Sequence, residues 1–305
     1  MSSANLPPSV SSQPVGDQGS RPAVGHAGRR CARVYPPRQF QTPVRTYRHP
    51  RTGRHVTLIG TMHVGTAQYY AALGELVSGL EAGGAVVFCE GTRQATVPND
   101  QALAVSDAEA AVLEHVEQAA AFTARRVAEL GWVTQLAALP HRPGWRIADL
   151  SMLEVIRRAG VEVMAARFRR TLRRLDWSDG ARRRPHLFRL GVAVTLRTAG
   201  RADWTDRDAG DQVLVHERTA VVLAAVHGTD RDAVLLWGAA HLPGLEADLA
   251  NAGYEPAGER WYTVATVPRI WRAIIGAVLG WPAPGSVEPA RSRPSIVDAR
   301  NRSNR

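Results

Sequence analysis

The fold is decided by two similar stretches of sequence, HVTLIGTMH at residues 55–63 and AVLLWGAAH at residues 233–241. Each begins with a short apolar run, which is typical of a buried strand. A glycine follows directly, at a point where the chain must turn and a residue without a Cβ meets no steric penalty. A histidine stands three residues later, before a segment with helical spacing. The pattern predicts two copies of one strand–Gly-x-x-His–helix element.

A further strand is expected after each copy. After the first, helical spacing at residues 66–80 leads to the apolar run Ala85–Cys89. After the second, a helix that begins at Pro243 and ends near Gly253 leads to Trp261–Ala265. Because strand–helix–strand crossovers are right-handed, the two strands of the first unit should be parallel. The duplication therefore predicts one α/β domain whose single sheet contains both units.

The residues between the two copies, at about 100–230, are expected to form a mainly helical insertion. Capping-box sequences at Ser106 and Ser151 mark the starts of two helices. A short strand at Trp145–Ala148 would carry Asp149 to the edge of the sheet. The insertion would thus contribute a polar side chain to the same edge as the two repeats.

The charge of the chain is concentrated at its ends. The net charge is +10, and every one of the 38 basic residues is arginine. Residues 1–50 and 283–305 hold twelve arginines and three acidic residues, so they account for +9 of that charge. Residues 1–40 and 283–305 are also rich in Ser, Pro and Gly, which predicts disordered tails around a domain at residues 41–282. A nearly neutral domain, and an arginine bias typical of genome base composition, argue against a nucleic-acid partner.

The protein is expected in the cytoplasm. Its two cysteines, Cys31 and Cys89, form no CxxC pair, and the N-terminus lacks an apolar signal sequence. The apolar run Ala273–Trp281 is too short to span a bilayer. An arginine-rich helix within residues 157–201 carries an apolar stripe, for which two interpretations stay open. It is either a solvated helical face or a peripheral contact with the inner face of an anionic membrane.

Candidate chemical residues gather at the carboxyl ends of the expected strands, where α/β sheets bind ligands. His63 and His241 each precede a helix N-terminus, whose partial positive charge keeps an imidazole neutral. Neutral imidazole serves as a metal ligand or as a general base. Glu90, at the end of the adjacent strand, is the carboxylate expected to join them, with Asp149 and Glu217 as the next candidates. Such ligands suit manganese, cobalt, iron or zinc.

Four motifs, in this order, resemble the TraB/GumN family, which includes bacterial pheromone-shutdown proteins and the animal TIKI metalloproteases. They are Leu58–Gly65, Val86–Arg93, His216–Arg218 and Val234–Gly244, within a likeness that covers about residues 53–266. The resemblance implies an erythromycin-esterase/ChaN-like α/β fold. For the TIKI branch it also implies divalent-metal-dependent peptide hydrolysis.

The resemblance assigns individual residues as well. The paired G-x-x-H motifs of the family match Gly60/His63 and Gly238/His241, its strand-end glutamate falls on Glu90, and its Glu-Arg pair falls on Glu217 and Arg218. Thr219 stands where the family commonly has asparagine, and the membrane segment that many TraB proteins carry is not evident. These departures bear on substrate and membrane attachment more than on the fold.

We therefore expect a metal-dependent, peptidase-like hydrolase that acts on a peptide or on a similar amide or ester. His63, Glu90 and His241 would hold a divalent metal (manganese, cobalt or zinc) and a water molecule whose pKa the ion lowers. Arg218 would stabilise the developing oxyanion or hold a substrate carboxylate. Two alternatives stay open. One is a non-catalytic protein that binds a peptide signal in the same cleft; the other is an esterase-like hydrolase without metal, in which His63 or His241 is the general base.

Overall fold

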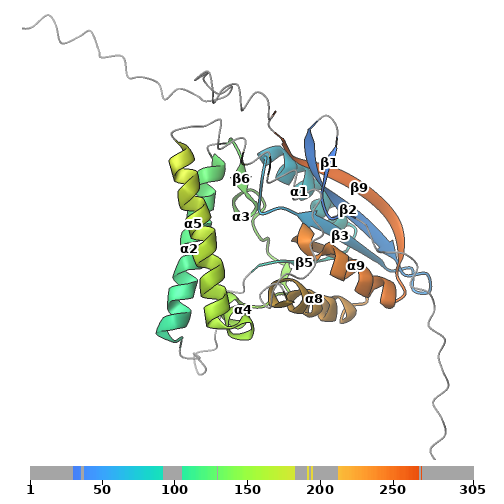
Figure 1. The fold of residues 1–305 in the computed structure, drawn as a ribbon. Helices are drawn as coiled ribbons and strands as arrows, with labels where there is room; N and C mark the ends of the chain where they lie inside the picture. The colour runs from blue at the N-terminus through green and yellow to red at the C-terminus, as the bar shows by residue number, and fades with distance from the viewer. Residues whose placement is uncertain are drawn as a thin grey trace, which may run out of the picture.

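A mixed sheet lies between helices, and a long pair of helices stands beside it (Figure 1). The computed structural model describes residues 30–35, 38–91, 105–128, 130–182, 191, 194, 212–267 and 269. The α/β class expected from the sequence is confirmed. Residues 1–29 of the tail predicted at 1–40 lie outside the described residues, as do the tail predicted at 283–305 and the apolar run at 273–281.

The large sheet has seven strands in the described part of the chain. They are β1 (Arg33–Tyr35), β2 (Gln39–Arg48), β3 (His55–Thr61), β5 (Val86–Cys89), β7 (Arg146–Ile147), β8 (Ala233–Gly238) and β9 (Glu255–Thr266), while β4 (Val64–Gly65) pairs with β6 (Val133–Thr134). The α-helices are α1 (Ala67–Ala82), α2 (Asp107–Ala128), α3 (Gln135–Ala138), α4 (Met152–Ala159), α5 (Val161–Arg182), α8 (Arg218–His227) and α9 (Leu242–Asn251). A π-helical turn, η1 (Gln212–Glu217), leads into α8, and a 3₁₀ turn, η2 (Ala239–His241), leads into α9.

The two Gly-x-x-His copies lie side by side at the centre of this sheet. β3 and β8 pair in parallel, with Gly60 opposite Trp237 and Thr61 opposite Gly238. β8 also pairs in parallel with β5, and β5 with β7. The predicted parallel orientation of β3 and β5 is therefore confirmed, with β8 between them. Because β5 neighbours β8, Glu90 follows a strand beside the second copy rather than beside the first.

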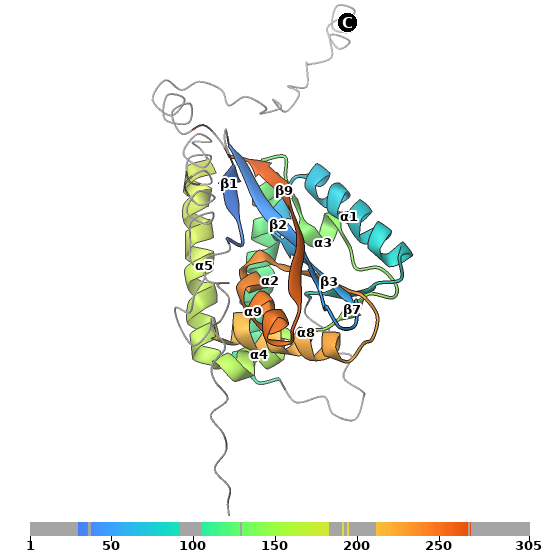
Figure 2. The ribbon, with the colours of Figure 1, turned by 90° about the vertical axis from the view of Figure 1, so that its right-hand side faces the viewer.

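The helices of the two copies cover opposite faces of the sheet (Figure 2). α1 packs Leu73 and Val77 against the face that carries Leu236 of β8. α8 and α9 pack against the other face, which carries Leu235 and Trp237. Full burial of one such aliphatic side chain stabilises a fold by about 1.5–3 kcal/mol. Coverage of both faces explains why β8 is apolar at every position rather than at alternate ones.

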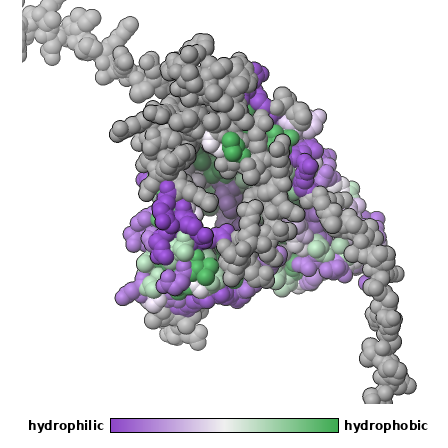
Figure 3. Space-filling model, in the orientation of Figure 1, coloured by the Kyte–Doolittle hydropathy of each residue, from purple (hydrophilic) through white to green (hydrophobic). Residues whose placement is uncertain are grey.

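The insertion is a helical unit with its own small core. Both predicted capping boxes are present, at Ser106 and at Ser151. α2, α4, α5 and η1 bury a separate cluster that includes Val112, Ile156 and Met164. Val161, Met164 and Phe168 of the α5 stripe are thus used in packing. Figure 3 shows hydrophilic and hydrophobic residues side by side in the coloured part of the α2–α5 region. None of the described helices is long and apolar enough to cross a membrane.

The amino-terminal boundary predicted from the sequence is wrong. β1 and the first residues of β2 belong to the sheet, so the predicted disordered tail at residues 1–40 does not hold for residues 33–35 and 39–40. Cys31 and Phe40 are buried as well. β2 is not evident in the sequence because it contains Pro43, and a proline inside an apolar run argues against a strand. In the structure Pro43 pairs with Trp261 of β9, which extends along the whole of β2.

Candidate active site

Glu90 and Gly238 meet where β5 and β8 end. Glu90 N donates to the carbonyl of Leu236 (3.0 Å), which continues the sheet by one residue, and Glu90 Oε2 accepts from Gly238 N (2.6 Å). A Cβ at position 238 would lie 2.8 Å from that same oxygen. The second motif glycine is therefore required by the close approach of a carboxylate. Its φ of −52° is open to any residue.

The first motif glycine is also explained by space. A Cβ at Gly60 would lie 3.1 Å from a Leu242 methyl group and 3.1 Å from the carbonyl oxygen of Pro43. Among the described residues, glycines with positive φ do not include Gly60 or Gly238. The sharp turn expected at these glycines is thus not the reason for their small size.

Arg218 joins two buried carboxylates at this edge. Its Nε donates to Asp149 Oδ1 (2.8 Å), and its Nη2 donates to Asp149 Oδ2 (2.6 Å) and to Glu90 Oε1 (2.8 Å). Nη1 donates to the carbonyl of Leu214 (3.4 Å). These four contacts use four of the five N–H groups of the guanidinium. Arg218 is therefore committed to holding protein carboxylates, which leaves it little capacity for the substrate role expected from the sequence.

Asp149 is the anchor of this network. Its side chain is fully buried, whereas those of Glu90 and Arg218 are 9% and 14% exposed. Besides Arg218, it accepts from the backbone N of Gly91 (3.1 Å) and of Leu150 (2.7 Å). Asp149 thus holds two groups in place, the backbone that follows β5 and the guanidinium of Arg218.

Glu90 is held in its ionised form. Burial, the largest influence, would raise the pKa of this carboxyl. The charge of Arg218 opposes burial most strongly, the imidazoles of His63 and His241 and the N–H of Gly238 act in the same direction, and the pKa falls below its ordinary value.

His241 is buried and neutral, with a defined tautomer. Its Nδ1 lies 3.1 Å from the carbonyl oxygen of Val215 and 3.1 Å from Thr219 Oγ1. The carbonyl can only accept, so Nδ1 carries the proton and Nε2 keeps its lone pair. Nε2 lies 3.8 Å from Glu90 Oε1. Burial is the main cause that lowers the pKa of His241 to about 4.

His63 lies at the margin of this centre. Its side chain is exposed, and its backbone carbonyl accepts from Gln135 N (2.8 Å). It is near enough to Glu90 for its charge to act on the carboxyl pKa. Within the described residues, however, no group of three His, Cys, Asp or Glu side chains is placed to hold a metal ion. The structure therefore brings Glu90 and His241 together and leaves His63 beside them.

The structure removes one candidate residue from this centre and adds another. Glu217 lies apart from the centre and pairs with Arg158 (3.0 Å). His141, which the sequence does not single out, places Nε2 3.2 Å from the carbonyl oxygen of Glu90. A Cβ at Gly91 would lie 2.6 Å from the His141 ring, so these two residues are fitted to each other. His141 lies in a loop without periodicity, and nothing in the sequence pattern could have identified it.

No protein-family model matches the chain, and no curated protein sequence matches it.

Proposed function

We propose that this protein is a hydrolase of the TraB/GumN type that uses a divalent metal to cleave a peptide or a similar amide or ester. The observation that supports this best is the pair of Glu90 Oε1 and His241 Nε2, which face each other at 3.8 Å without a proton between them. A lone pair and a carboxylate oxygen repel each other unless a cation or a water lies between them. Glu90 Oε1 and His241 Nε2 are therefore candidates for binding a cation or a water molecule together.

The charge of the centre favours a cation. Glu90 and Asp149 are each negative, Arg218 is positive and His241 is neutral, which leaves one uncompensated negative charge. Backbone N–H groups also donate to both carboxylates, but a buried net charge remains costly. A bound cation would remove that cost.

The residues present fit a metal in part. His241 offers Nε2, while a carbonyl and a hydroxyl hold its other nitrogen, as is usual for metal-binding histidines. Glu90 offers Oε1, although that oxygen also accepts from Arg218. The third donor in this proposal is His63, whose exposed side chain is not part of a three-residue group. A divalent ion at such a site supplies a Lewis acid and a nucleophilic water at neutral pH.

The other residues have supporting roles in this proposal. Glu90, ionised and fixed by Gly238 and Arg218, can take the proton of the attacking water. Asp149 is a positioning residue that keeps Arg218 in place. Arg218 acts mainly through Glu90, with its remaining Nη1 hydrogen as the part free to meet a substrate oxygen.

Metal titration tests this proposal before any substrate is known. Protein purified without chelators should bind one manganese, cobalt or zinc ion per chain, as measured by elemental analysis and calorimetry. His241→Ala should abolish that binding, and His63→Ala should weaken it. His227→Ala is the matched control, since His227 is an exposed histidine at the end of α8. If wild type binds no divalent ion, the metal-dependent mechanism is wrong.

Hydrolysis without metal is the second candidate. It is favoured by the engagement of Glu90 Oε1 with Arg218 and by the lack of a three-donor group among the described residues. In that case His241 Nε2 would act as the base, and chelators would leave turnover unchanged. A panel of peptide and ester substrates, assayed with and without manganese, separates the two mechanisms. Saturable binding without products in every condition would instead favour the non-catalytic peptide-binding protein.

We also propose that the protein works in the reducing cytoplasm. Cys31 and Cys89 are both buried and unpaired. Burial raises the pKa of Cys31 to about 11 and that of Cys89 to about 12, so both stay protonated and inert.

A further inference from the structure

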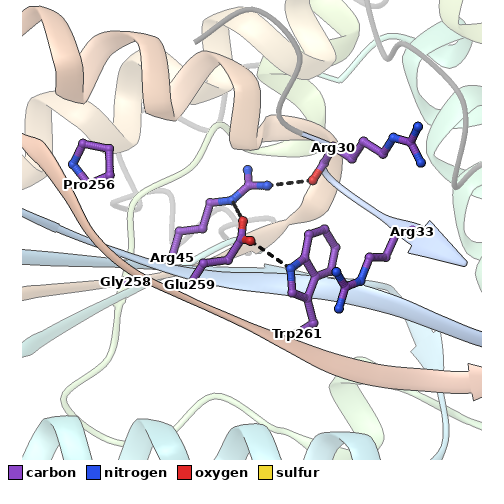
Figure 4. Close-up of a pocket in the computed structure, with 7 residues that line it drawn as sticks. All are labelled: Arg30, Arg33, Arg45, Pro256, Gly258, Glu259 and Trp261. Carbon is purple, nitrogen blue, oxygen red and sulfur yellow. Dashed lines mark hydrogen bonds and ion pairs between the residues drawn. The ribbon is translucent and has the colours of Figure 1, made fainter. Parts of the chain in front are cut away.

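A pocket lies away from the candidate active site, between the amino-terminal residues and the edge strand β9. Its volume is about 600 Å³, and Arg30, Arg33, Arg45, Glu259 and Trp261 are among the residues that line it (Figure 4). None of them belongs to the Glu90–His241 centre. A pocket of this size can hold a small molecule.

Arg45 forms the fixed floor of this pocket. It is 1% exposed, and it pairs with Glu246 of α9 and with Glu259 of β9 (2.8 Å). Its Nη2 donates to the carbonyl of Arg30 (2.8 Å), which ties the amino-terminal residues to the sheet. Because protein partners engage its guanidinium from several sides, Arg45 supports the pocket rather than offering donors to a ligand.

Arg33 is held quite differently. Its Nε donates to Gln41 Oε1 (2.9 Å), and its guanidinium carbon lies 4.1 Å from the Trp261 ring centre and 5.1 Å from that of Tyr35. Trp261 is itself fixed, since its Nε1 donates to Glu259 Oε2 (2.9 Å). Figure 4 shows the Arg33 guanidinium in front of the indole ring. The side chain is thus fixed by one hydrogen bond and two aromatic contacts.

The outer end of Arg33 remains available. In the part of the chain that the structure describes, no hydrogen bond or ion pair engages Nη1 or Nη2 of this residue. Two parallel N–H groups on a fixed guanidinium match the geometry of a carboxylate or a phosphate. Arg30, Arg33 and Arg45 against Glu246 and Glu259 also leave this region with one net positive charge.

We propose that this pocket binds the phosphate or carboxylate group of a small soluble ligand, with Arg33 as the bidentate anchor and Trp261 as the wall against which the ligand packs. The site is independent of the proposed hydrolase chemistry, because it shares no residue with it. A ligand here would bridge β1 and β9 and so stabilise the amino-terminal part of the sheet.

Calorimetric titration of the full chain with inorganic phosphate and with acetate, at constant ionic strength, tests this proposal. Wild type should bind at least one of the two anions, and Arg33→Gln should weaken that binding at least tenfold. Arg51→Gln is the matched control, since Arg51 is an exposed arginine in the turn between β2 and β3. Vesicles that contain phosphatidic acid present the same phosphate group on a membrane and should bind no better than inorganic phosphate.

Several results would contradict anion binding through Arg33. Equal anion affinity of wild type and Arg33→Gln overturns the proposal, as does the absence of anion binding to wild type. Binding only to vesicles overturns the assignment of a soluble ligand. If Arg33→Gln fails to fold, Arg33→Lys keeps the charge but loses the fork, and it should still bind at least threefold more weakly than wild type. Trp261→Phe, which keeps an aromatic wall, should retain most of the affinity.

Discussion

Gly238 allows the carboxylate of Glu90 to reach the backbone of β8. In Gly238→Ala, the new Cβ would lie 2.8 Å from Glu90 Oε2, so the carboxylate must move and its bond from residue 238 weakens. A buried charged group that loses a partner costs about 1–3 kcal/mol. We expect a loss of that size in the free energy of unfolding, measured in urea, together with the loss of any metal binding or turnover.

Gly79→Ala is the control for this substitution. A Cβ at Gly79 of α1 meets nothing within 4 Å. Alanine favours a helix over glycine by about 0.5–1 kcal/mol, so this variant should be slightly more stable than wild type. If the two variants were equally stable, the close approach at Gly238 would not be the reason for that glycine.

His241 makes stability depend on pH in metal-free protein. Its pKa falls from 6.5 to about 4 in the fold, mainly because of burial. As pH falls below 6.5, the unfolded chain takes up the proton first. Stability that is present above 6.5 is therefore lost between about pH 6.5 and 4, by at most about 3 kcal/mol. Urea unfolding in the presence of a chelator should show this slope in wild type and in His227→Gln, but not in His241→Gln. A slope unchanged in His241→Gln would mean that the buried histidine is not neutral.

The sequence identified most of the residues of the candidate active site, but not which of them lie in contact with Glu90. Glu90, Asp149 and His241 were expected at one edge because each follows a predicted strand, and they meet there. His63 was expected among them by symmetry with His241. The sheet breaks that symmetry, because β5 with its glutamate neighbours β8 and not β3. Strand order depends on long-range pairing, which the local sequence pattern does not contain.

At the level of elements, the capping box of α4 supports the anchor of the candidate site. Ser151 Oγ accepts from Glu154 N (3.1 Å), and Glu154 Oε2 accepts from Ser151 N (2.7 Å). Ser151→Ala removes one half of this exchange and should cost about 0.5–2 kcal/mol. Because Asp149 stands two residues earlier, faster hydrogen exchange should appear at the start of α4 and at Leu150.

Ser151→Thr is the control, because it keeps a hydroxyl and should stay within about 0.5 kcal/mol of wild type. An equal loss of unfolding free energy in both variants would rule out the cap as the cause.

Elements with strong periodicity were predictable, and elements that depend on distant partners were not. α1 follows its apolar spacing and begins after Thr66, whose side chain caps it. β2 carries Pro43 and the buried Arg45, which no strand template anticipates. Arg45 is tolerated there because Glu246 and Glu259 come from α9 and β9, some 200 residues later in the chain. β1 is in the sheet through its antiparallel pairing with the start of β2, at residues where composition alone predicts a tail.

For the whole molecule, the helix pair and the sheet present different surfaces. The sheet carries both proposed sites, one at the carboxyl ends of the parallel strands and one beside its antiparallel edge. In the described part of the α2–α5 pair, several apolar residues pack into its own core, and Arg169, Arg170 and Arg173 are exposed. Exposed arginines of this kind favour charge attraction to an anionic surface.

Association with polyanions should depend on the charged ends of the chain. Because +9 of the net +10 charge lies in residues 1–50 and 283–305, binding to DNA or to anionic vesicles should be electrostatic and independent of sequence. Its affinity should fall steeply, by a factor of about 10³ or more, between 50 and 200 mM salt if six or more phosphates are contacted. The triple variant Arg291→Gln, Arg293→Gln, Arg300→Gln removes three of these charges, so it should bind more weakly at low salt and show a smaller salt slope. Fluorescence titration with two unrelated DNA duplexes, beside vesicle sedimentation, measures this. Salt-resistant binding that distinguishes the two duplexes would mean that the charge of this chain serves nucleic-acid recognition after all.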